Sequence, residues 1–174
     1  MASNKYTLRD ALPGEFPEIG KLMVRVYSVL EGFPTPEEQP AYYKLLANIG
    51  SLTNSPQTRL LVAVTPSGKI GGAVVYFGDM QYYGSGGTAT SEKNAAGFRL
   101  LAVDPAARGN GLGKLLTNAC IQTAKSAGLN QMVIHSTEAM KIAWGMYERI
   151  GFIRSEDLDF MQGELEVFGF RLKL

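Results

Sequence analysis

One junction in the chain, residues 98–116, constrains its fold and chemistry more than any other segment. It reads Phe-Arg-Leu-Leu-Ala-Val-Asp-Pro-Ala-Ala-Arg-Gly-Asn-Gly-Leu-Gly-Lys-Leu-Leu: an apolar strand, a proline, an arginine, three alternating glycines and the start of an amphipathic helix. A strand that turns into a helix in this way presents backbone N–H groups at the positive end of the helix dipole. The sequence therefore predicts an anion site, suited to a pyrophosphate, over residues 108–114.

The spacing of these glycines excludes two common nucleotide motifs. A P-loop needs four residues between its first glycine and the Gly-Lys pair, followed by Ser or Thr. Here only three residues separate Gly109 from Gly113, and Leu115 follows Lys114. A dinucleotide fingerprint reads G-x-G-x-x-G, whereas Gly109, Gly111 and Gly113 read G-x-G-x-G. The anion site therefore belongs to a different class.

Composition limits the class of protein further. The chain has 174 residues and a formal net charge of +1, with one Cys, one His and no run of Lys or Arg. A nearly neutral chain argues against nucleic acid or an anionic membrane as the main partner. One Cys and one His leave no internal disulfide and argue against a metal site. With neither an apolar run of membrane length nor a signal peptide, we expect a cytoplasmic protein.

Hydrophobic periodicity predicts a mixed order of elements. In chain order, we expect a strand over 6–11, helices over 16–30 and 37–52, a hairpin of strands over 60–64 and 70–77, a loop over 78–94, a strand over 98–103, a helix over 111–127, a strand over 132–135, a helix over 138–150, and strands over about 152–159 and 164–172. This order predicts an α/β fold with mixed layers around one central sheet.

Two motifs in this frame resemble a known family. Arg108-x-x-Gly111-x-Gly113, directly after Val103-x-Pro105, resembles motif A of the GNAT superfamily of N-acetyltransferases, which binds the pyrophosphate of acetyl-CoA. Ala143-x-x-x-Tyr147-Glu-Arg-x-Gly151-Phe152 resembles the family's motif B. The chain is identified as a member of this superfamily. The resemblance implies a GNAT-type fold, with a central, mostly antiparallel sheet, a splayed parallel pair and helices on both faces. It also implies one acetyltransferase domain over 1–174.

The resemblance implies how acetyl-CoA is held. Amides of the glycine loop would face the pyrophosphate, and free amides of the preceding strand would bond the pantetheine arm and polarise the thioester carbonyl. Arg108 either contacts a phosphate or braces the loop, and Lys114 is either a phosphate partner or a solvated helix residue. The implied cofactor-binding residues are Leu101, Ala102, Val103, Arg108, Gly109, Asn110, Gly111, Leu112, Gly113, Lys114, Met140, Ala143 and Tyr147.

Two side chains are candidates for proton transfer. Tyr147 is implied as the acid that assists the departing thiolate, through a hydrogen bond, a depressed pKa or a late proton transfer; the alternative is a half-buried packing role. Many relatives carry a Glu base where Gly97 stands and an Asn where Met140 stands. His135 is a candidate substitute base, although a single His among apolar strand residues is more often structural. We expect a weakly basic acceptor or deprotonation through water.

The implied function is transfer of an acetyl group from acetyl-CoA to a primary amine, directly and in a ternary complex without a metal. The alternative is a non-catalytic CoA-binding sensor or interaction module, and transfer of a longer acyl group is a further possibility.

Cys120, on the apolar face of its helix, is a poor covalent intermediate, and Trp144 is expected to pack. The acceptor, a small-molecule or peptide amine, would meet the variable segments 31–39, 78–94 and 160–164. The C-terminal strands suggest a homodimer edge.

Overall fold

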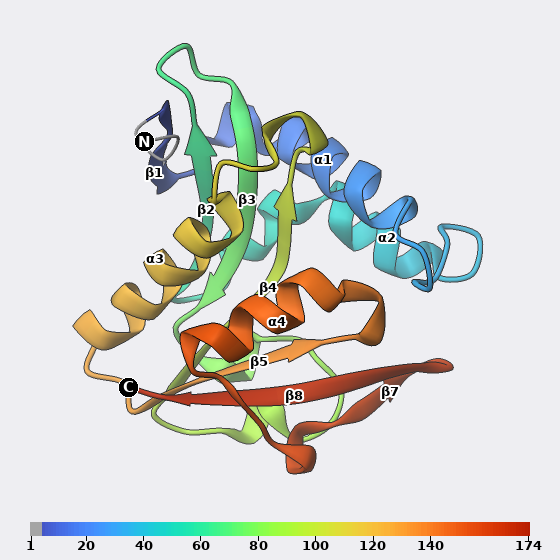
Figure 1. Ribbon diagram of the computed structural model, residues 1–174, viewed down its shortest axis with the longest axis vertical. Coiled ribbons are helices and arrows are strands. Elements are labelled where there is room, and N and C mark those ends of the chain that lie inside the picture. The colour runs from blue at the N-terminus through green and yellow to red at the C-terminus, as the bar shows by residue number, and fades with distance from the viewer. Residues whose placement is uncertain (1–4) are drawn as a thin grey trace.

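One eight-stranded sheet organises residues 5–174, the part of the chain that the computed structural model describes (Figure 1). Its spatial order is β1-β2-β3-β4-β5-β8-β6, and β7 pairs with β8. All pairs are antiparallel except β4 with β5, which confirms the predicted sheet with one parallel pair. The strands are β1 (Thr7–Asp10), β2 (Thr58–Val64), β3 (Ile70–Phe77), β4 (Ala95–Val103), β5 (Gln131–Ser136), β6 (Ile153–Arg154), β7 (Phe160–Gln162) and β8 (Leu165–Lys173).

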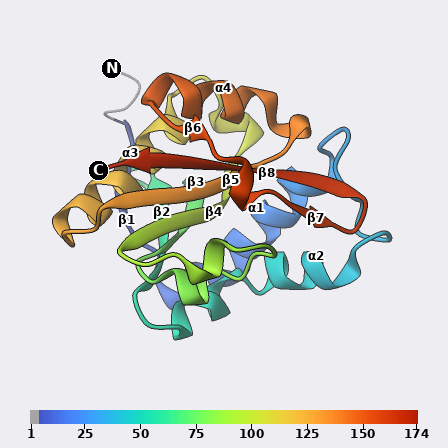
Figure 2. The same cartoon turned by 90° about the horizontal axis from the view of Figure 1, so that it is seen from below.

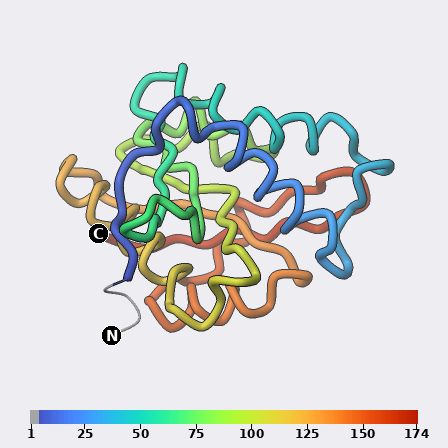
Figure 3. The backbone as a smooth tube through the Cα atoms, turned by 90° about the horizontal axis from the view of Figure 1, so that it is seen from above, coloured from blue at the N-terminus to red at the C-terminus, as the bar shows by residue number. Residues whose placement is uncertain are grey.

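Helices cover both faces of this sheet. They are α1 (Phe16–Ser28), α2 (Pro40–Ala47), α3 (Leu112–Ser126) and α4 (Lys141–Ile150). Figures 2 and 3 show α1 and α2 on one face and α3 and α4 on the other, named here the α1–α2 face and the α3–α4 face. Within residues 5–174, each helix is too short or too polar to cross a membrane.

The side chains of the two parallel strands alternate between these faces. Ala95 and Val133 are buried in the core of the α1–α2 face. Ala96 and Met132 are buried in the core of the α3–α4 face. This alternation determines which residues of β4 and β5 can reach a ligand from each side.

The parallel pair separates soon after it forms. Cα partners join 95–97 of β4 to 131–133 of β5 and stop there. On its other side, β4 has a bulge against β3, where the register shifts between Ala73 and Val75. Leu100 within the bulge has a φ of 62°, an uncommon value for a branched residue that marks local strain. Residues 98–103 of β4 consequently have no strand partner on the β5 side, as the predicted splay requires.

The second predicted helix, 37–52, is shorter in the structure. Proline is favoured at the first position of a helix, and Pro40 takes that position in α2. The residue before a proline avoids the α region, and Gln39 has φ −136° and ψ 68°. After Ala47 the chain tightens into a 3₁₀ turn, Ile49–Asn54. The helix prediction was therefore wrong at both ends.

The predicted strand over 152–159 is also wrong for most of its length. Only β6 (Ile153–Arg154) forms, and a 3₁₀ turn follows at Glu156–Leu158. The Arg154 guanidinium pairs with the Asp159 carboxylate at 2.9 Å, and Asp159 also accepts the N–H of Gly169 at 2.7 Å. These bonds fold the segment back. The predicted helix 138–150 similarly begins with a separate 3₁₀ turn, Glu138–Met140, before α4.

Candidate functional site

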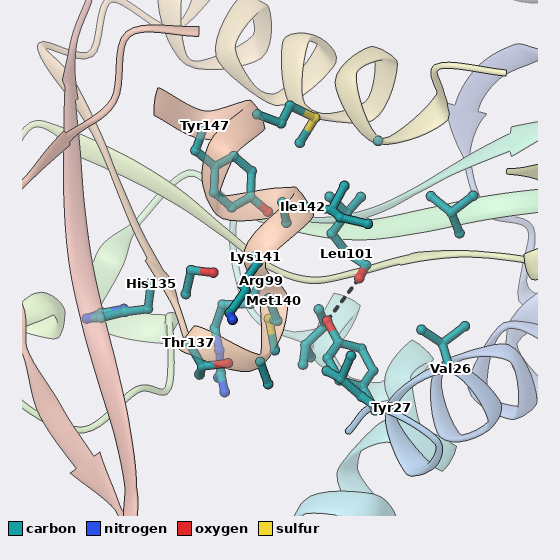
Figure 4. A pocket seen from close by; sticks show the side chains of 18 of the residues that line it. Val26, Tyr27, Arg99, Leu101, His135, Thr137, Met140, Lys141, Ile142 and Tyr147 are labelled. Carbon is teal, nitrogen blue, oxygen red and sulfur yellow. Dashed lines mark hydrogen bonds between the residues drawn. The ribbon is translucent and has the colours of Figure 1, made fainter. Parts of the chain in front are cut away.

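A cavity of about 1610 Å³ opens where β4 and β5 separate (Figure 4). The glycine loop and α4 line it from one face of the sheet, and α1, the 31–33 turn and β7 line it from the other. Every residue predicted to hold acetyl-CoA lines this cavity except Ala102 and Asn110. The Ala102 side chain is buried in the core of the α1–α2 face. Asn110 instead braces the loop, because its Nδ2 donates to the Ala107 carbonyl at 2.7 Å.

The glycine loop supplies a row of free backbone donors. Gly109 and Gly111 have φ values of 83° and 71°, which let the chain turn sharply into α3. The first α3 bond is from the Leu115 N–H to the Gly111 carbonyl at 3.0 Å. Among the described residues, no acceptor meets the N–H groups of 109–114. A Cβ on either glycine would meet nothing within 4 Å, so there is open space beside the loop, and its free donors suit a pyrophosphate.

Tyr147 extends from α4 into the cavity (Figure 4). Its ring is 5% exposed and packs edge-on against Phe98 and Phe152, with centroids 5.6 and 5.8 Å away. Within residues 5–174 its hydroxyl has no hydrogen-bond partner. Burial raises the pKa of Tyr147, which argues against the depressed pKa considered for it. The hydroxyl is a neutral donor that is available to a ligand.

The space beside Gly97 is already filled. A Cβ on Gly97 would lie 2.6 Å from the Val133 carbonyl oxygen, 2.7 Å from the Tyr83 ring and 2.9 Å from the Met80 sulfur. Tyr83, from the predicted loop over 78–94, is 1% exposed. A glutamate at Gly97 therefore cannot be accommodated, which gives a steric reason for its absence.

His135 is held at both ring nitrogens. Nε2 lies 2.9 Å from the Leu158 carbonyl oxygen, which can only accept, so Nε2 carries the proton. Nδ1 then accepts the hydrogen bond of the Tyr83 hydroxyl at 3.0 Å. Burial lowers the pKa of His135, which favours the neutral ring. The imidazole lines the cavity, but it has no free lone pair to accept a proton while the Tyr83 hydroxyl is bonded to Nδ1.

Aromatic side chains line the part of the cavity on the α1–α2 face. Tyr27, Phe33 and Tyr42 form one group, with centroid separations of 5.5 to 6.4 Å. The Tyr27 hydroxyl donates to the Leu101 carbonyl at 2.9 Å and so ties α1 to the bulge of β4 (Figure 4). Across the cavity, the His135 ring packs edge-on against Phe160 at 5.0 Å. The three segments predicted to meet the acceptor all contribute to this lining.

Carboxylates are sparse in this compartment. Asp79 accepts the Gln81 N–H at 3.1 Å and caps a turn, and Glu92 pairs with Arg171. Glu31 lines the cavity but is exposed at its rim. No carboxylate of the described residues occupies the interior position of a base.

Sequence reasoning missed several polar residues that line the cavity, among them Arg99, Ser136 and Thr137. The Ser136 and Thr137 hydroxyls are buried without a hydrogen-bond partner in the described structure. For Arg99 the sequence did offer a signal, a charged residue inside the apolar run of β4.

Cys120 is fully buried in α3, and Trp144 packs edge-on against Phe170 at 4.9 Å, as predicted for both.

Comparison with known proteins places this geometry in a family context. The model of the acetyltransferase (GNAT) family matches residues 23–152. A mycothiol acetyltransferase from Thermobispora bispora is 42% identical over 55 residues, which cover 32% of this chain and 19% of that relative. The match thus spans about a fifth of the relative's length.

Solved structures share the fold across the whole chain. A GNAT acetyltransferase from Staphylococcus aureus Mu50 has a TM-score of 0.73 at 16% identity, covering 97% of this chain and 99% of that one. The spermidine N-acetyltransferase of Vibrio cholerae, in complex with CoA and spermine, has a TM-score of 0.64 at 18% identity, covering 98% and 96%. At this low identity the likeness shows the fold alone.

Proposed function

The chain belongs to the acetyltransferase (GNAT) family, and on that premise we propose that it transfers the acetyl group of acetyl-CoA directly to a primary amine in a ternary complex. One observation carries the proposal. A single cavity reaches from the free amides of the glycine loop, past the Tyr147 hydroxyl, to an aromatic compartment on the α1–α2 face. Two substrates can therefore meet inside the sheet without a covalent enzyme intermediate.

Residues on the α3–α4 side hold the donor in this proposal. The N–H groups of Gly109–Lys114 bind the pyrophosphate at the positive end of α3. Arg108 and Lys114 are exposed at the cavity and add positive charge there. Met140 and Ala143 offer apolar contact to the pantetheine arm. Acetyl-CoA supplies the acetyl group as a thioester and a thiolate as leaving group.

Tyr147 and the splayed strand serve the chemical step. The unpaired edge of β4 at Leu101–Val103 turns backbone donors toward the cavity, where they can polarise a carbonyl as an oxyanion site does. The Tyr147 hydroxyl donates a hydrogen bond to sulfur as negative charge develops there. Because the pKa of Tyr147 is raised by burial, this donor stays protonated.

The acceptor amine loses its proton without a dedicated carboxylate base. At pH 7, neutralising a lysine-like amine costs about 4.6 kcal/mol, whereas an α-amino group costs about 1.4 kcal/mol. We therefore propose a weakly basic amine or deprotonation through water. The hydrogen bonds of His135 support a positioning role for its ring, and a role as base would require Tyr83 to release Nδ1.

Release of free CoA with a panel of primary amines tests this function. We expect steady, amine-dependent release by the wild-type protein. Acetyl-CoA binding should be retained by Tyr147→Phe, measured by calorimetry. Tight acetyl-CoA binding without turnover on any amine would instead support a CoA-binding sensor.

A further inference from the structure

We propose that the acceptor carries a carboxylate in addition to its amine, and that the Arg99 guanidinium and the Thr137 hydroxyl bind this carboxylate on the α1–α2 face of the cavity. The inference rests on the proposed function, since it names the class of amine that the same cavity accepts. It implies an amino acid or a related amino carboxylate.

The strand register places the two residues on one face. Gly97 is the Cα partner of Val133 in the parallel pair. Arg99 lies two residues beyond Gly97, and His135 two beyond Val133, so their side chains point to the same face by alternation. Thr137 has extended backbone angles, φ −128° and ψ 165°, and continues the alternation from His135. Both Arg99 and Thr137 line the cavity there, and Figure 4 labels them in its interior.

Arg99 is a half-buried cation with unused donors. Its Nη1 donates to the Tyr83 carbonyl at 2.9 Å, and its guanidinium lies 5.6 Å from the Tyr83 ring centroid. No carboxylate among residues 5–174 forms an ion pair with it. A guanidinium has five N–H donors in a planar fork that matches a carboxylate. A charge held in partly apolar surroundings without a counterion is costly, and a bound anion offsets that cost.

Four titratable side chains that interact with Arg99 are neutral. Burial raises the pKa of Tyr27, Tyr42 and Tyr83, and the positive charge of Arg99 opposes that rise in all three. Burial lowers the pKa of His135, and Arg99 lowers it further. The guanidinium therefore lies among four uncharged groups. Two carboxylates line the cavity, those of Glu31 and Glu138, and both are exposed at its rim.

Thr137 is an independent sign of a ligand. The residue is 3% exposed, and its hydroxyl has no hydrogen-bond partner in the described structure. Buried hydroxyls are almost always paired, so an unpaired one on a residue that lines a cavity indicates a polar group of a bound molecule. A carboxylate that accepts from both Arg99 and Thr137 satisfies both side chains. A polycationic amine such as spermine would instead place positive charge beside the guanidinium.

Matched amines test the inference. Glycine, 4-aminobutyrate, 6-aminohexanoate and phenylalanine are each compared with the amine that lacks only the carboxylate, and kcat/KM is corrected to the neutral amine. We expect the wild-type protein to prefer at least one amino carboxylate by about tenfold or more. Arg99→Met should abolish that preference, and Arg99→Lys should retain part of it. Arg59→Met, on β2 and outside the cavity, is the matched control and should keep it.

Thr137→Val separates a ligand contact from a structural one. The substitution removes a buried hydroxyl without a partner, so Tm should be unchanged or higher. At the same time, kcat/KM for the amino carboxylate should fall several-fold, and that for its decarboxylated partner should not. An equal loss for both amines, or a lower Tm that accompanies it, contradicts a carboxylate contact.

A binding measurement keeps this test separate from the proposed function. Calorimetry in the presence of CoA compares N-acetylphenylalanine with N-acetyl-2-phenylethylamine, and the carboxylated compound should bind more tightly by an Arg99-dependent margin. If no amine is acetylated, the proposed function is wrong. The binding comparison would still show whether Arg99 recognises a carboxylate. Equal binding of both compounds, or loss of acetyl-CoA affinity in Arg99→Met, overturns the assignment.

Discussion

The Tyr83 hydroxyl donates a hydrogen bond to Nδ1 of His135 at 3.0 Å, and the Tyr83 ring closes the space above Gly97. One side chain from a distant loop thus occupies the position of a carboxylate base and also engages the nearest imidazole. The pair consists of two side chains whose burial favours their neutral forms. Its consequences can be measured in stability, in kinetics and in the tolerance of Gly97.

Protonation of His135 should destabilise the fold. Burial lowers the folded-state pKa of His135, so the unfolded state binds a proton near pH 6.5 that the folded state binds only at lower pH. The free energy of unfolding should therefore fall as pH drops below about 6.5, by at most about 1.4 kcal/mol per pH unit, until the folded pKa is passed. Urea titrations across this pH range give the free energy of unfolding of wild type and His135→Gln. This free energy should depend less steeply on pH in the variant. Identical slopes would contradict a buried neutral imidazole.

The rate of transfer should follow the ionisation of the acceptor. Without a carboxylate near Gly97, kcat/KM should rise with pH along each amine's own pKa and shift when acceptors of different pKa are compared. His135→Gln should leave the shape of this profile unchanged. An inflection near pH 6 to 7 that stays fixed between acceptors, and disappears in His135→Gln, would make His135 the base.

Tyr147→Phe should lower kcat more than it raises KM for acetyl-CoA. The hydroxyl has no partner in the described structure, and its hydrogen bond forms as charge develops on sulfur. A hydrogen bond to a charged group is worth about 1.5–3 kcal/mol, so kcat should fall by roughly 10- to 100-fold. Steady-state kinetics with the best amine measure this. Unchanged kcat, with chemistry shown to be rate-limiting, would leave Tyr147 with packing against Phe98 and Phe152 only.

Gly111→Asp should abolish tight acetyl-CoA binding while the protein stays folded. A Cβ at Gly111 meets nothing within 4 Å, but the new carboxylate would face the pyrophosphate. Gly111→Asn is the matched control, because Asn has the same shape and tolerates the same positive φ without the charge. Calorimetry should show much weaker binding for Asp than for Asn. Equal affinities of the two variants would mean that the loop does not bind an anion.

Gly97→Ala should destabilise the protein. Its Cβ would lie 2.6 Å from the Val133 carbonyl oxygen of β5 and 2.7 Å from the ring of Tyr83, and both residues are buried. Overpacking of this kind costs about 1–3 kcal/mol. Gly14→Ala, where a Cβ meets nothing within 4 Å, is the control and should change stability little. A Tm for Gly97→Ala equal to that of Gly14→Ala would show that the site can expand.

Local chemistry made the conformation of the glycine loop predictable from sequence. Positive φ at Gly109 and Gly111, free amides at a helix start and a tyrosine on the next helix all follow from residues close together in the chain. The strand order and the splayed pair followed from the family resemblance. Element ends were less predictable. Pro40 delayed α2, and the Arg154–Asp159 ion pair folded an apparent strand into a turn.

The acceptor side that we propose could not be predicted in the same way. Arg99 lies in the middle of β4, Thr137 just after β5 and Tyr83 in a loop, and only the β4–β5 register and the burial of that loop bring them together. Periodicity shows that β4 is apolar but does not show which face Arg99 takes. An unpaired hydroxyl such as that of Thr137 leaves no trace in a sequence.

The short pairing of β4 with β5 also has a mechanical meaning. Strands β1–β4 form one part of the sheet and β5, β8 and β6 form another, and the strand pairing between the two parts is limited to residues 95–97 of β4 and 131–133 of β5. A molecule that contacts both parts of the sheet across the cavity should stabilise this short pairing when it binds. Amide hydrogen exchange at Ala96 and Val133, which lie in this pairing, should therefore slow when a ligand occupies the cavity.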